Sequence, residues 1–268
     1  MKQTRWGILG PGNIAQNFAD GLAQAPSGIL TAIASTSADR RASFGDRNNV
    51  KSDKRHASYE ALLADKDVDA VYISTPHPWH AEWAIKAMRA GKAVLVEKPA
   101  GMNAAEVIAV TDVAQQCDTF FMEAYMYRCH PQITRVLEII ASGEIGKLSH
   151  IKANFGFNAK FNAASRLYDR KLGGGGILDV GGYCTSLARL IAGAAQGLPF
   201  AEPTTLKGAG IIGESGVDEV AYGLLTFAGG FTAEIACAVA RNMDNRAIIT
   251  GAIGYIEIVD PWVPGRNA

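Results

Sequence analysis

The residues with the clearest chemical potential follow a short apolar stretch, Ala93–Val96, and are Glu97, Lys98 and Pro99. Four apolar residues, two of them valine, predict a buried strand. Pro99 ends the strand because it cannot donate to a sheet ladder and because it disfavours the helical conformation at Lys98. In an open parallel sheet, ligands bind beyond the carboxyl ends of the strands. Lys98 is therefore a candidate active-site lysine, although a solvated Glu-Lys pair would explain this strand end equally well.

A glycine pattern near the start of the chain predicts a dinucleotide site. The short strand Trp6–Leu9 runs into Gly10, Pro11, Gly12, Asn13, Ile14 and Ala15, and a helical pattern then continues through Ala25. Gly10 permits a tight turn, Gly12 lets the backbone approach a pyrophosphate, and Ala15 keeps the helix close to the strand. We expect these six residues to hold phosphates at the positive end of the helix dipole. The alternative is a tight strand-to-helix turn without a ligand.

The end of the second predicted strand, Leu30–Ala34, bears on the choice between NAD and NADP. An NAD site usually has an acid there, which binds the ribose 2′-hydroxyl. This chain has Ser35, Thr36 and Ser37, followed by Arg40 and Arg41, and we expect Asp39 to cap the next helix. Hydroxyl groups and Arg40 suit a 2′-phosphate. The sequence therefore favours NADP, with NAD as the alternative.

A third strand, Val68–Ser74, ends on Thr75, Pro76, His77, Pro78, Trp79 and His80. Because this strand end belongs to the same predicted sheet edge, we count Thr75, Pro76, His77, His80, Glu97 and Lys98 among the candidate cofactor-binding residues. For His80, packing or capping at the start of the next helix is an equally good interpretation.

The order of the predicted elements divides the chain into two domains. Strands and helices alternate at short spacing in residues 1–124, which predicts a doubly wound parallel sheet, a Rossmann domain. Residues 125–268 instead predict an α+β domain with a large, mostly antiparallel open sheet. Its expected strands are a half-buried antiparallel one around Ile151–Phe157, a hairpin of Val220–Phe227 with Phe231–Val239, and a hairpin of Arg246–Thr250 with Tyr255–Val259.

The overall composition excludes several classes of protein. The 268 residues are 48% hydrophobic and 19% charged, which is typical of a globular protein with a sizeable core. The 26 basic and 26 acidic residues balance, so the composition does not favour nucleic acid or an anionic membrane as a partner. The four cysteines and five histidines are scattered, which predicts reduced thiols in a cytoplasmic protein and no metal site. Met1–Trp6 enters a strand directly, without the apolar region of a signal peptide.

A second pair of candidate residues follows the glycine run Gly173–Gly176. Asp179 and Tyr183 are four residues apart, so on a helix they lie on one face, one turn from each other. The glycines before them would let a ligand or another backbone come close. Taken alone, the spacing fits a helix-start carboxylate and a core aromatic at least as well as it fits a catalytic pair.

Taken together, these residues resemble the glucose–fructose oxidoreductase / inositol dehydrogenase (Gfo/Idh/MocA) family. Gly10–Ala15, Glu97–Pro99 and Gly173–Tyr183 occur in the family's order and spacing, and Glu123–Pro131 is similar to the branch of dimeric dihydrodiol dehydrogenase and NADP-dependent D-xylose dehydrogenase. That branch often has an arginine where Thr36 stands. The family also continues for several dozen residues beyond Ala268, so we expect the second domain to be incomplete. The resemblance implies a homodimer formed through the C-terminal sheet.

The resemblance also implies a reaction: reversible hydride transfer between a nicotinamide and the hydroxyl-bearing carbon of a sugar or vicinal diol. Lys98 would be the active-site lysine, with Asp179 and Tyr183 as its partners. A free tyrosine has a pKa near ~10, and a lysine ammonium beside it would lower that pKa. We expect Tyr183 to be the acid/base, Lys98 to bind the hydroxyl and Asp179 to orient Lys98. Lys98 and Tyr183 could exchange roles.

The substrate itself is not specified by the sequence. Candidate substrate contacts are Tyr125, Arg128, Phe157, Arg166 and Tyr168, which suit a polyol. Alternative functions are an NAD-dependent glycoside hydrolase of the same fold and a non-catalytic NADP-binding regulator, and an incomplete C-terminus raises a third alternative, an inactive product.

Overall fold

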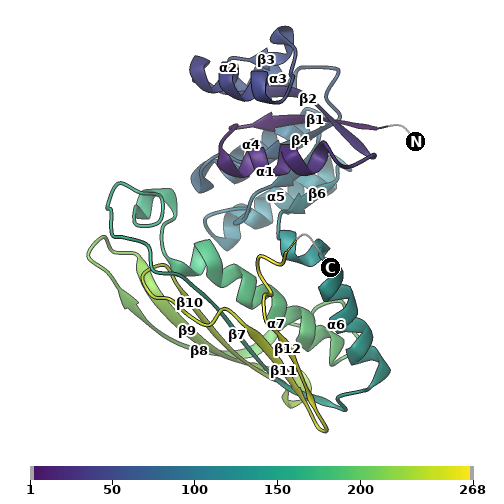
Figure 1. The fold of residues 1–268 in the computed structure, drawn as a ribbon, viewed down its shortest axis with the longest axis vertical. Helices are drawn as coiled ribbons and strands as arrows, with labels where there is room; N and C mark the ends of the chain where they lie inside the picture. The colour runs from purple at the N-terminus through teal and green to yellow at the C-terminus, as the bar shows by residue number, and fades with distance from the viewer. Residues whose placement is uncertain (1–2, 266–268) are drawn as a thin grey trace. The chain divides into compact units, whose positions relative to one another are not determined.

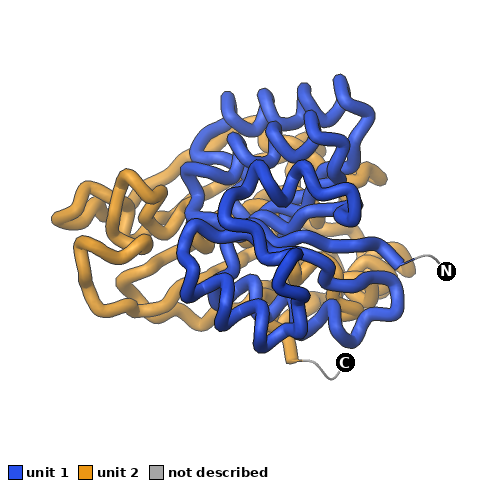
Figure 2. Tube along the Cα trace, turned by 90° about the horizontal axis from the view of Figure 1, so that it is seen from above, with its two compact units in different colours: residues 1–124 blue, residues 125–268 orange. Residues whose placement is uncertain are grey.

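The computed structural model describes residues 3–265, and the chain forms two compact units that divide between Ala124 and Tyr125 (Figures 1 and 2). Residues 266–268, the end of the chain from which we expected an incomplete second domain, lie outside the described residues, as do Met1 and Lys2.

Unit 1 contains a six-stranded parallel sheet with the strand order β3-β2-β1-β4-β5-β6. The strands are β1 (Thr4–Leu9), β2 (Gly28–Ala34), β3 (Arg55–His56), β4 (Ala70–Ile73), β5 (Ala93–Val96) and β6 (Phe121–Glu123). This sheet confirms the predicted doubly wound Rossmann domain. The order reverses between β1 and β4, and ligands of such sheets bind at this switch point.

Five α-helices connect the strands of unit 1: α1 (Asn13–Leu22), α2 (Ala38–Arg47), α3 (Tyr59–Leu63), α4 (His80–Arg89) and α5 (Ala104–Gln116). Short 3₁₀ turns cover Ser52–Lys54 and His77–Trp79. Helices cover both faces of the sheet. Successive residues of a strand point to opposite faces, so each strand contributes to two cores. Leu9 and Ile73 belong to the core shared with α3, α4 and α5, whereas Ile8 and Tyr72 belong to the core shared with α1 and α2.

Helices α2 and α5 of unit 1 begin at residues with capping side chains. Asn103 caps α5, with its side chain accepting a hydrogen bond from the Glu106 N–H. The cap expected at Asp39 is wrong, because Ser37 caps α2 by accepting from the Arg40 N–H and Asp39 lies in the first turn. Helix α1 ends at Leu22, three residues before the predicted end.

Asp65 is the centre of a cluster of charges in unit 1. Lys54 Nζ lies 2.9 and 3.0 Å from its two oxygens, the Asp67 N–H donates at 2.9 Å, and His56 Nε2 lies 3.0 Å away. Its side chain is only 7% exposed. Burial acts to raise the pKa of Asp65, but the bonds from Asp67, Lys54 and His56 outweigh it and lower the pKa from 3.8 to about 2.

This depressed pKa makes the stability of unit 1 sensitive to acid. A carboxyl whose pKa is lower in the folded state stabilises the fold above its unfolded pKa, and that contribution is lost as the pH falls through the folded pKa. Between about pH 5 and pH 2, we expect the wild type to lose about 2 kcal/mol more unfolding free energy than Asp65→Asn. Urea unfolding across this range measures the difference. The exposed Asp112→Asn is the matched control, and an Asp65→Asn curve parallel to the wild type would contradict the assignment.

Unit 2 contains a second six-stranded sheet with the order β12-β11-β7-β10-β9-β8. Its strands are β7 (Leu148–Gly156), β8 (Pro203–Ile212), β9 (Asp218–Phe227), β10 (Thr232–Ala238), β11 (Ala247–Gly251) and β12 (Tyr255–Ile258). Both predicted hairpins are confirmed, as β9 with β10 and β11 with β12. The strand around Ile151–Phe157 needs correction, because β7 is parallel to β10 and antiparallel only to β11, and it ends at Gly156, before Phe157.

Helix α7 (Gly182–Ala194) lies along one face of this sheet, with α6 (Pro131–Ser142) beside it (Figure 1). The helix packs on β7 and β10 through side chains that include Leu187, Ile191, Ile151 and Ala233. Short 3₁₀ turns cover Met126–Cys129, Arg170–Leu172 and Ala228–Gly230, and a π turn covers Ile177–Gly181. Of the helices in residues 3–265, none combines the length and the apolar character that crossing a membrane requires.

Candidate active site

In unit 1, the turn after β1 leaves the start of α1 open. Gly10 has φ = +83°, and a Cβ there would lie 3.2 Å from Ser74 O and Thr75 N. Gly12 is the N-cap of α1, and it makes no side-chain cap bond to the first turn. A Cβ on Gly12 would meet nothing closer than 3.9 Å. Such a helix start has unpaired N–H groups and room for an anion, which is what a pyrophosphate requires.

The remaining residues of this turn divide between the core and the surface. Ala15 is fully buried against the sheet, as expected of the third position of the fingerprint. Pro11 is buried, whereas Asn13 and Ile14 are exposed at the helix start.

The end of β2 is organised by serine side chains. Ser35 is buried, and its Oγ accepts a hydrogen bond from the Ser37 N–H at 3.2 Å, while Ser37 Oγ accepts from the Arg40 N–H at 3.3 Å. Arg41 Nη1 donates to Ser35 O at 2.5 Å, so its guanidinium supports the turn. Thr36 and the Arg40 side chain are exposed. Arg40 is thus the arginine that this turn leaves to solvent.

The segment after β4 contributes one unpaired polar group and one histidine with a supporting role. Thr75 Oγ1 is buried and has no hydrogen-bond partner among residues 3–265. His77 is buried, whereas Pro76 is exposed. The His80 side chain is 1% exposed, and its nitrogens lie 2.7 Å from Pro99 O and 2.6 Å from Thr75 O. His80 therefore joins two turns at the sheet edge rather than presenting a ring nitrogen to a ligand.

Lys98 follows β5 at the same sheet edge and is half-buried. The carboxylate of the preceding Glu97 accepts a hydrogen bond from the Tyr72 hydroxyl, which comes from the neighbouring strand β4. The Lys98–Pro99 peptide is cis. Sheet pairing holds the backbone on the N-terminal side of Lys98, and the contact of Pro99 O with His80 holds it on the C-terminal side.

In unit 2, Asp179 and Tyr183 are both buried at the start of α7. Asp179 accepts a hydrogen bond from Arg166 Nη1 at 2.9 Å, so the structure pairs two of the predicted site residues. The helical spacing that we expected needs one correction. Asp179 lies in the π turn Ile177–Gly181, and Tyr183 lies in the regular helix that follows. Single π turns of this kind are frequent at functional sites.

Tyr183 lies among four aromatic rings. Ring centroids of Tyr125, Phe155, Tyr127 and Trp262 are 5.2, 5.3, 5.8 and 6.0 Å from its own. Trp262 Nε1 donates to Asn154 O at 2.6 Å. This packing fixes the ring of Tyr183. Tyr127, Phe155 and Trp262 were not among the predicted site residues; only the aromatic pair Tyr125 and Tyr127 in the sequence could have indicated one of them.

The other predicted substrate contacts form two pairs in unit 2: the Arg128 N–H donates to Tyr125 O at 3.0 Å, and Phe157 packs against the cluster that contains Tyr168. The Tyr125 hydroxyl packs directly against Gly182. The Arg128 guanidinium lies 4.7 Å from the centroid of Phe200. Phe157 is half-buried against Tyr168, which is itself buried and donates its hydroxyl hydrogen to Ala159 O at 2.8 Å. Tyr168 thus has a packing role.

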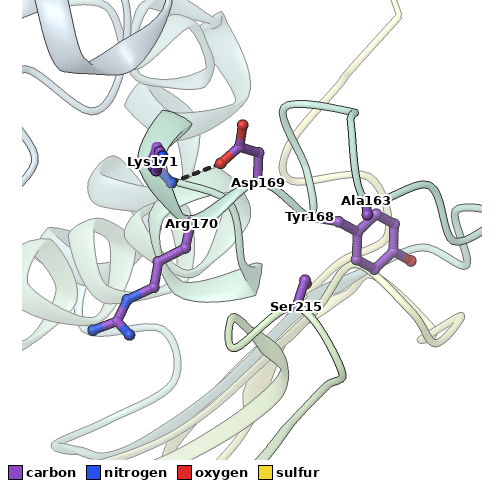
Figure 3. A pocket seen from close by; sticks show the side chains of 6 residues that line it. All are labelled: Ala163, Tyr168, Asp169, Arg170, Lys171 and Ser215. Carbon is purple, nitrogen blue, oxygen red and sulfur yellow. Dashed lines mark hydrogen bonds between the residues drawn. The ribbon is translucent and has the colours of Figure 1, made fainter.

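A surface depression of about 500 Å³ in unit 2 lies beside Tyr168 (Figure 3). It is lined by Ala163, Tyr168, Asp169, Arg170, Lys171 and Ser215. The Asp169 carboxylate accepts a hydrogen bond from the Lys171 N–H at 2.8 Å, and the Arg170 side chain extends away from the Tyr168 ring. Neither Asp179 nor Tyr183 lines this depression, so the predicted chemistry is not located there.

Comparisons with known proteins agree with this fold. Residues 4–125 match the model of an oxidoreductase family with an NAD-binding Rossmann fold, and residues 133–257 match the GFO/IDH/MocA C-terminal domain. The mouse trans-1,2-dihydrobenzene-1,2-diol dehydrogenase is 36% identical over 262 residues, which cover 97% of this chain and 76% of that protein. The human protein of that name is 32% identical over 263 residues, with the same two coverages.

Two solved structures are also similar. A 3-ketoreductase from Actinomadura kijaniata in complex with NADP and TDP-benzene has a TM-score of 0.84 and 30% identity, covering 98% of this chain and 78% of that one. An aldose-aldose oxidoreductase from Caulobacter crescentus complexed with glycerol has a TM-score of 0.87 and 25% identity, with the same coverages.

Proposed function

The chain belongs to the GFO/IDH/MocA family of NAD(P)-binding oxidoreductases, and we propose that it transfers a hydride between a nicotinamide cofactor, NADP in preference to NAD, and the hydroxyl-bearing carbon of a sugar or vicinal diol. Relatives of this chain are named as dihydrodiol dehydrogenases, a ketoreductase and an aldose oxidoreductase. All of these names describe redox chemistry at a carbon that carries a hydroxyl or carbonyl oxygen.

The observation that carries the proposal is the uncapped start of α1 beside Gly10. The turn has no Cβ at Gly10 or Gly12 and no side-chain cap at Gly12. At the neighbouring strand end, the Thr75 hydroxyl has no hydrogen-bond partner within residues 3–265. These features fit a dinucleotide, whose phosphates accept hydrogen bonds from a helix start. When bound, the nicotinamide supplies the hydride chemistry, and the protein supplies binding, orientation and proton handling.

We assign the proton handling to three side chains. Tyr183 exchanges a proton with the substrate hydroxyl at its Oη, and Lys98 binds that hydroxyl through Nζ, where its charge favours the phenolate form of a tyrosine. Asp179 is the orienting group. Its hydrogen bond from Arg166 supports this assignment, because a carboxylate bound to a guanidinium points in a fixed direction.

The preference for NADP makes Arg40 a specificity residue. Arginine pairs with a phosphate through charge-assisted hydrogen bonds, and the Arg40 side chain is exposed beside Ser37. We expect Arg40→Ala to weaken NADPH binding by about 10-fold and to leave NADH binding within about twofold, because only NADPH carries the 2′-phosphate. Nicotinamide fluorescence titration measures both affinities. Arg47→Ala, on the same helix, is the control; equal losses for the two nucleotides would contradict the role of Arg40.

We further propose that two copies associate through the open face of the unit 2 sheet. The registers place Tyr222 and Leu224, which are 44% and 48% exposed, on the same face as Lys152 and Glu234. Lys152 Nζ lies 3.8 Å from Glu234 Oε1. A patch with apolar residues and both charges can pair with its own copy about a twofold axis. Light scattering should give the mass of a dimer, and Leu224→Glu should give a monomer. A monomeric wild type across the accessible concentrations would contradict this proposal.

The substrate class is tested with a panel of aldoses, polyols and vicinal diols, supplied with NADP or NAD. Net reduction of the nucleotide supports the oxidoreductase proposal. Hydrolysis of a glycoside without net reduction would instead indicate the NAD-dependent hydrolase, and nucleotide binding without any turnover would indicate a regulator.

A further inference from the structure

The peptide unit that follows Lys98 and Pro99 is held at both ends by side chains. Its carbonyl oxygen, Pro99 O, lies 2.7 Å from His80 Nδ1, and its N–H, on Ala100, donates to Glu123 Oε1 at 2.8 Å. One peptide plane is therefore fixed from two sides, by residues 19 and 23 positions away in the chain.

The sheet cannot hold this peptide by itself. The ladder of β5 ends at Val96, and the last backbone bond to β4 at this edge runs from the Glu97 N–H to Ile73 O. Ala100 is buried, so its N–H needs a partner inside the protein. Glu123 supplies that partner from the end of the next strand, where it is in register with Val96. The Glu123 carboxylate thus extends the hydrogen bonding of the sheet beyond its last residue.

His80 holds the other side of the same peptide. Both of its ring nitrogens face carbonyl oxygens, those of Pro99 and Thr75, and only a doubly protonated ring donates to both. Burial lowers the pKa of His80, while the two carbonyl oxygens and the charge of Glu97 act in the opposite direction. A neutral ring donates to one carbonyl only, so Glu123 provides the bond to this peptide that does not depend on the protonation of an imidazole.

We propose that Glu123 is a positioning residue for Lys98: by accepting the Ala100 N–H, it fixes the backbone on which the lysine is carried and thereby the direction of its ammonium group. This inference rests on the proposed function of Lys98. Glu123 also lies within electrostatic reach of Lys98 and Glu97. The carboxylate could act through its acceptor oxygen or through its charge, and the proposal assigns the effect to the acceptor.

Two variants separate these roles. Glu123→Gln keeps an oxygen that accepts from Ala100 but removes the charge, whereas Glu123→Ala removes both. A misplacement of about 1 Å can cost about 10²-fold in rate, so we expect Glu123→Ala to lower kcat by about 10- to 100-fold and Glu123→Gln to stay within a few-fold of the wild type. NADPH affinity should not change in either variant, because no cofactor contact is assigned to Glu123.

Glu106, in the first turn of α5, offers a control because its carboxylate bonds to the same loop. Its carboxylate accepts a hydrogen bond from the Met102 N–H at 2.8 Å, two residues beyond Ala100. Glu106→Ala removes this bond, and the one that Glu106 Oε1 accepts from Asn103 Nδ2, without touching the peptide after Pro99, and its kcat should equal that of the wild type. In a Lys98→Met background, Glu123→Ala should cause no further loss, because a residue that acts through Lys98 has nothing left to position.

A readout that needs no turnover keeps this inference distinct from the proposed function. Acetylation by acetic anhydride, followed by peptide mass spectrometry, gives the reactivity of Lys98 relative to the exposed Lys66. We expect this ratio to change at least about threefold in Glu123→Ala and to stay at the wild-type value in Glu123→Gln and Glu106→Ala.

The outcomes are decisive in both directions. An unchanged Lys98 ratio in Glu123→Ala, or a Glu123→Gln variant as impaired as Glu123→Ala, would overturn the inference. A changed ratio in a protein whose wild type reduces no nucleotide with any sugar or diol would support the positioning role and reject the proposed function instead.

Discussion

Replacing Lys98 by methionine is expected to lower kcat by about 10³-fold. The change keeps a flexible side chain of similar length and removes the ammonium group, which is both the donor to the substrate hydroxyl and the charge that favours a phenolate. Removal of one donor to a developing charge costs about 10² to 10³ in rate.

Steady-state kinetics with the best substrate of the panel measure this effect. Lys98→Arg is the informative companion variant, since it keeps the charge but spreads it over a planar group, and we expect it to recover only part of the activity. Lys86→Met, which removes an exposed lysine paired with Glu82 on α4, is the control. A Lys98→Met variant that keeps activity within a few-fold of the wild type would remove the lysine from the mechanism.

Replacing Tyr183 by phenylalanine is expected to lower kcat by about 10²- to 10⁴-fold, the range typical of a lost general acid or base. The ring of Tyr183 is buried among Tyr125, Tyr127, Phe155 and Trp262, so phenylalanine should fill the same space. The variant therefore isolates the hydroxyl. NADPH affinity should remain near that of the wild type, because no cofactor contact is assigned to this side chain.

Tyr127→Phe is the matched control for Tyr183→Phe. Tyr127 is fully buried in the same aromatic cluster, and its hydroxyl donates to Ser186 Oγ at 2.9 Å. Its removal should cost about 1 kcal/mol of stability, the usual net value of a neutral hydrogen bond, and should leave kcat unchanged. Equal turnover of Tyr183→Phe and the wild type would show that another group transfers the proton, with Lys98 as the first candidate.

The parts of the fold that were predicted are those set by local patterns. Buried apolar runs between helices fix a parallel sheet, and a glycine-containing turn between alternating stretches fixes the hairpin of β9 and β10. The strand β8 was missed because nearly all of its residues are exposed, so its sequence shows no alternation. The parallel pairing of β7 with β10 was missed because it joins segments about 80 residues apart, which no local pattern specifies.

The candidate site shows the same limit. Gly10, Gly12 and Lys98 could be proposed from the sequence because glycine and proline at a strand end constrain the backbone locally. The pair of Arg166 with Asp179, the ring of Trp262 beside Tyr183 and the bond of Glu123 to Ala100 depend on tertiary packing, and none follows from spacing. The sequence also could not distinguish Ser37 from Asp39 as the cap of α2, because both residue types are good N-caps and lie two positions apart.

The most direct test of the central claim is the appearance of the reduced-nicotinamide absorbance band when purified protein is mixed with NADP and each member of the panel of aldoses, polyols and vicinal diols. We expect a signal with NADP and at least one of these compounds, a weaker signal with NAD, and none with Lys98→Met. No reduction with any compound, in a protein that binds NADPH by fluorescence, would contradict hydride transfer as the function of this chain.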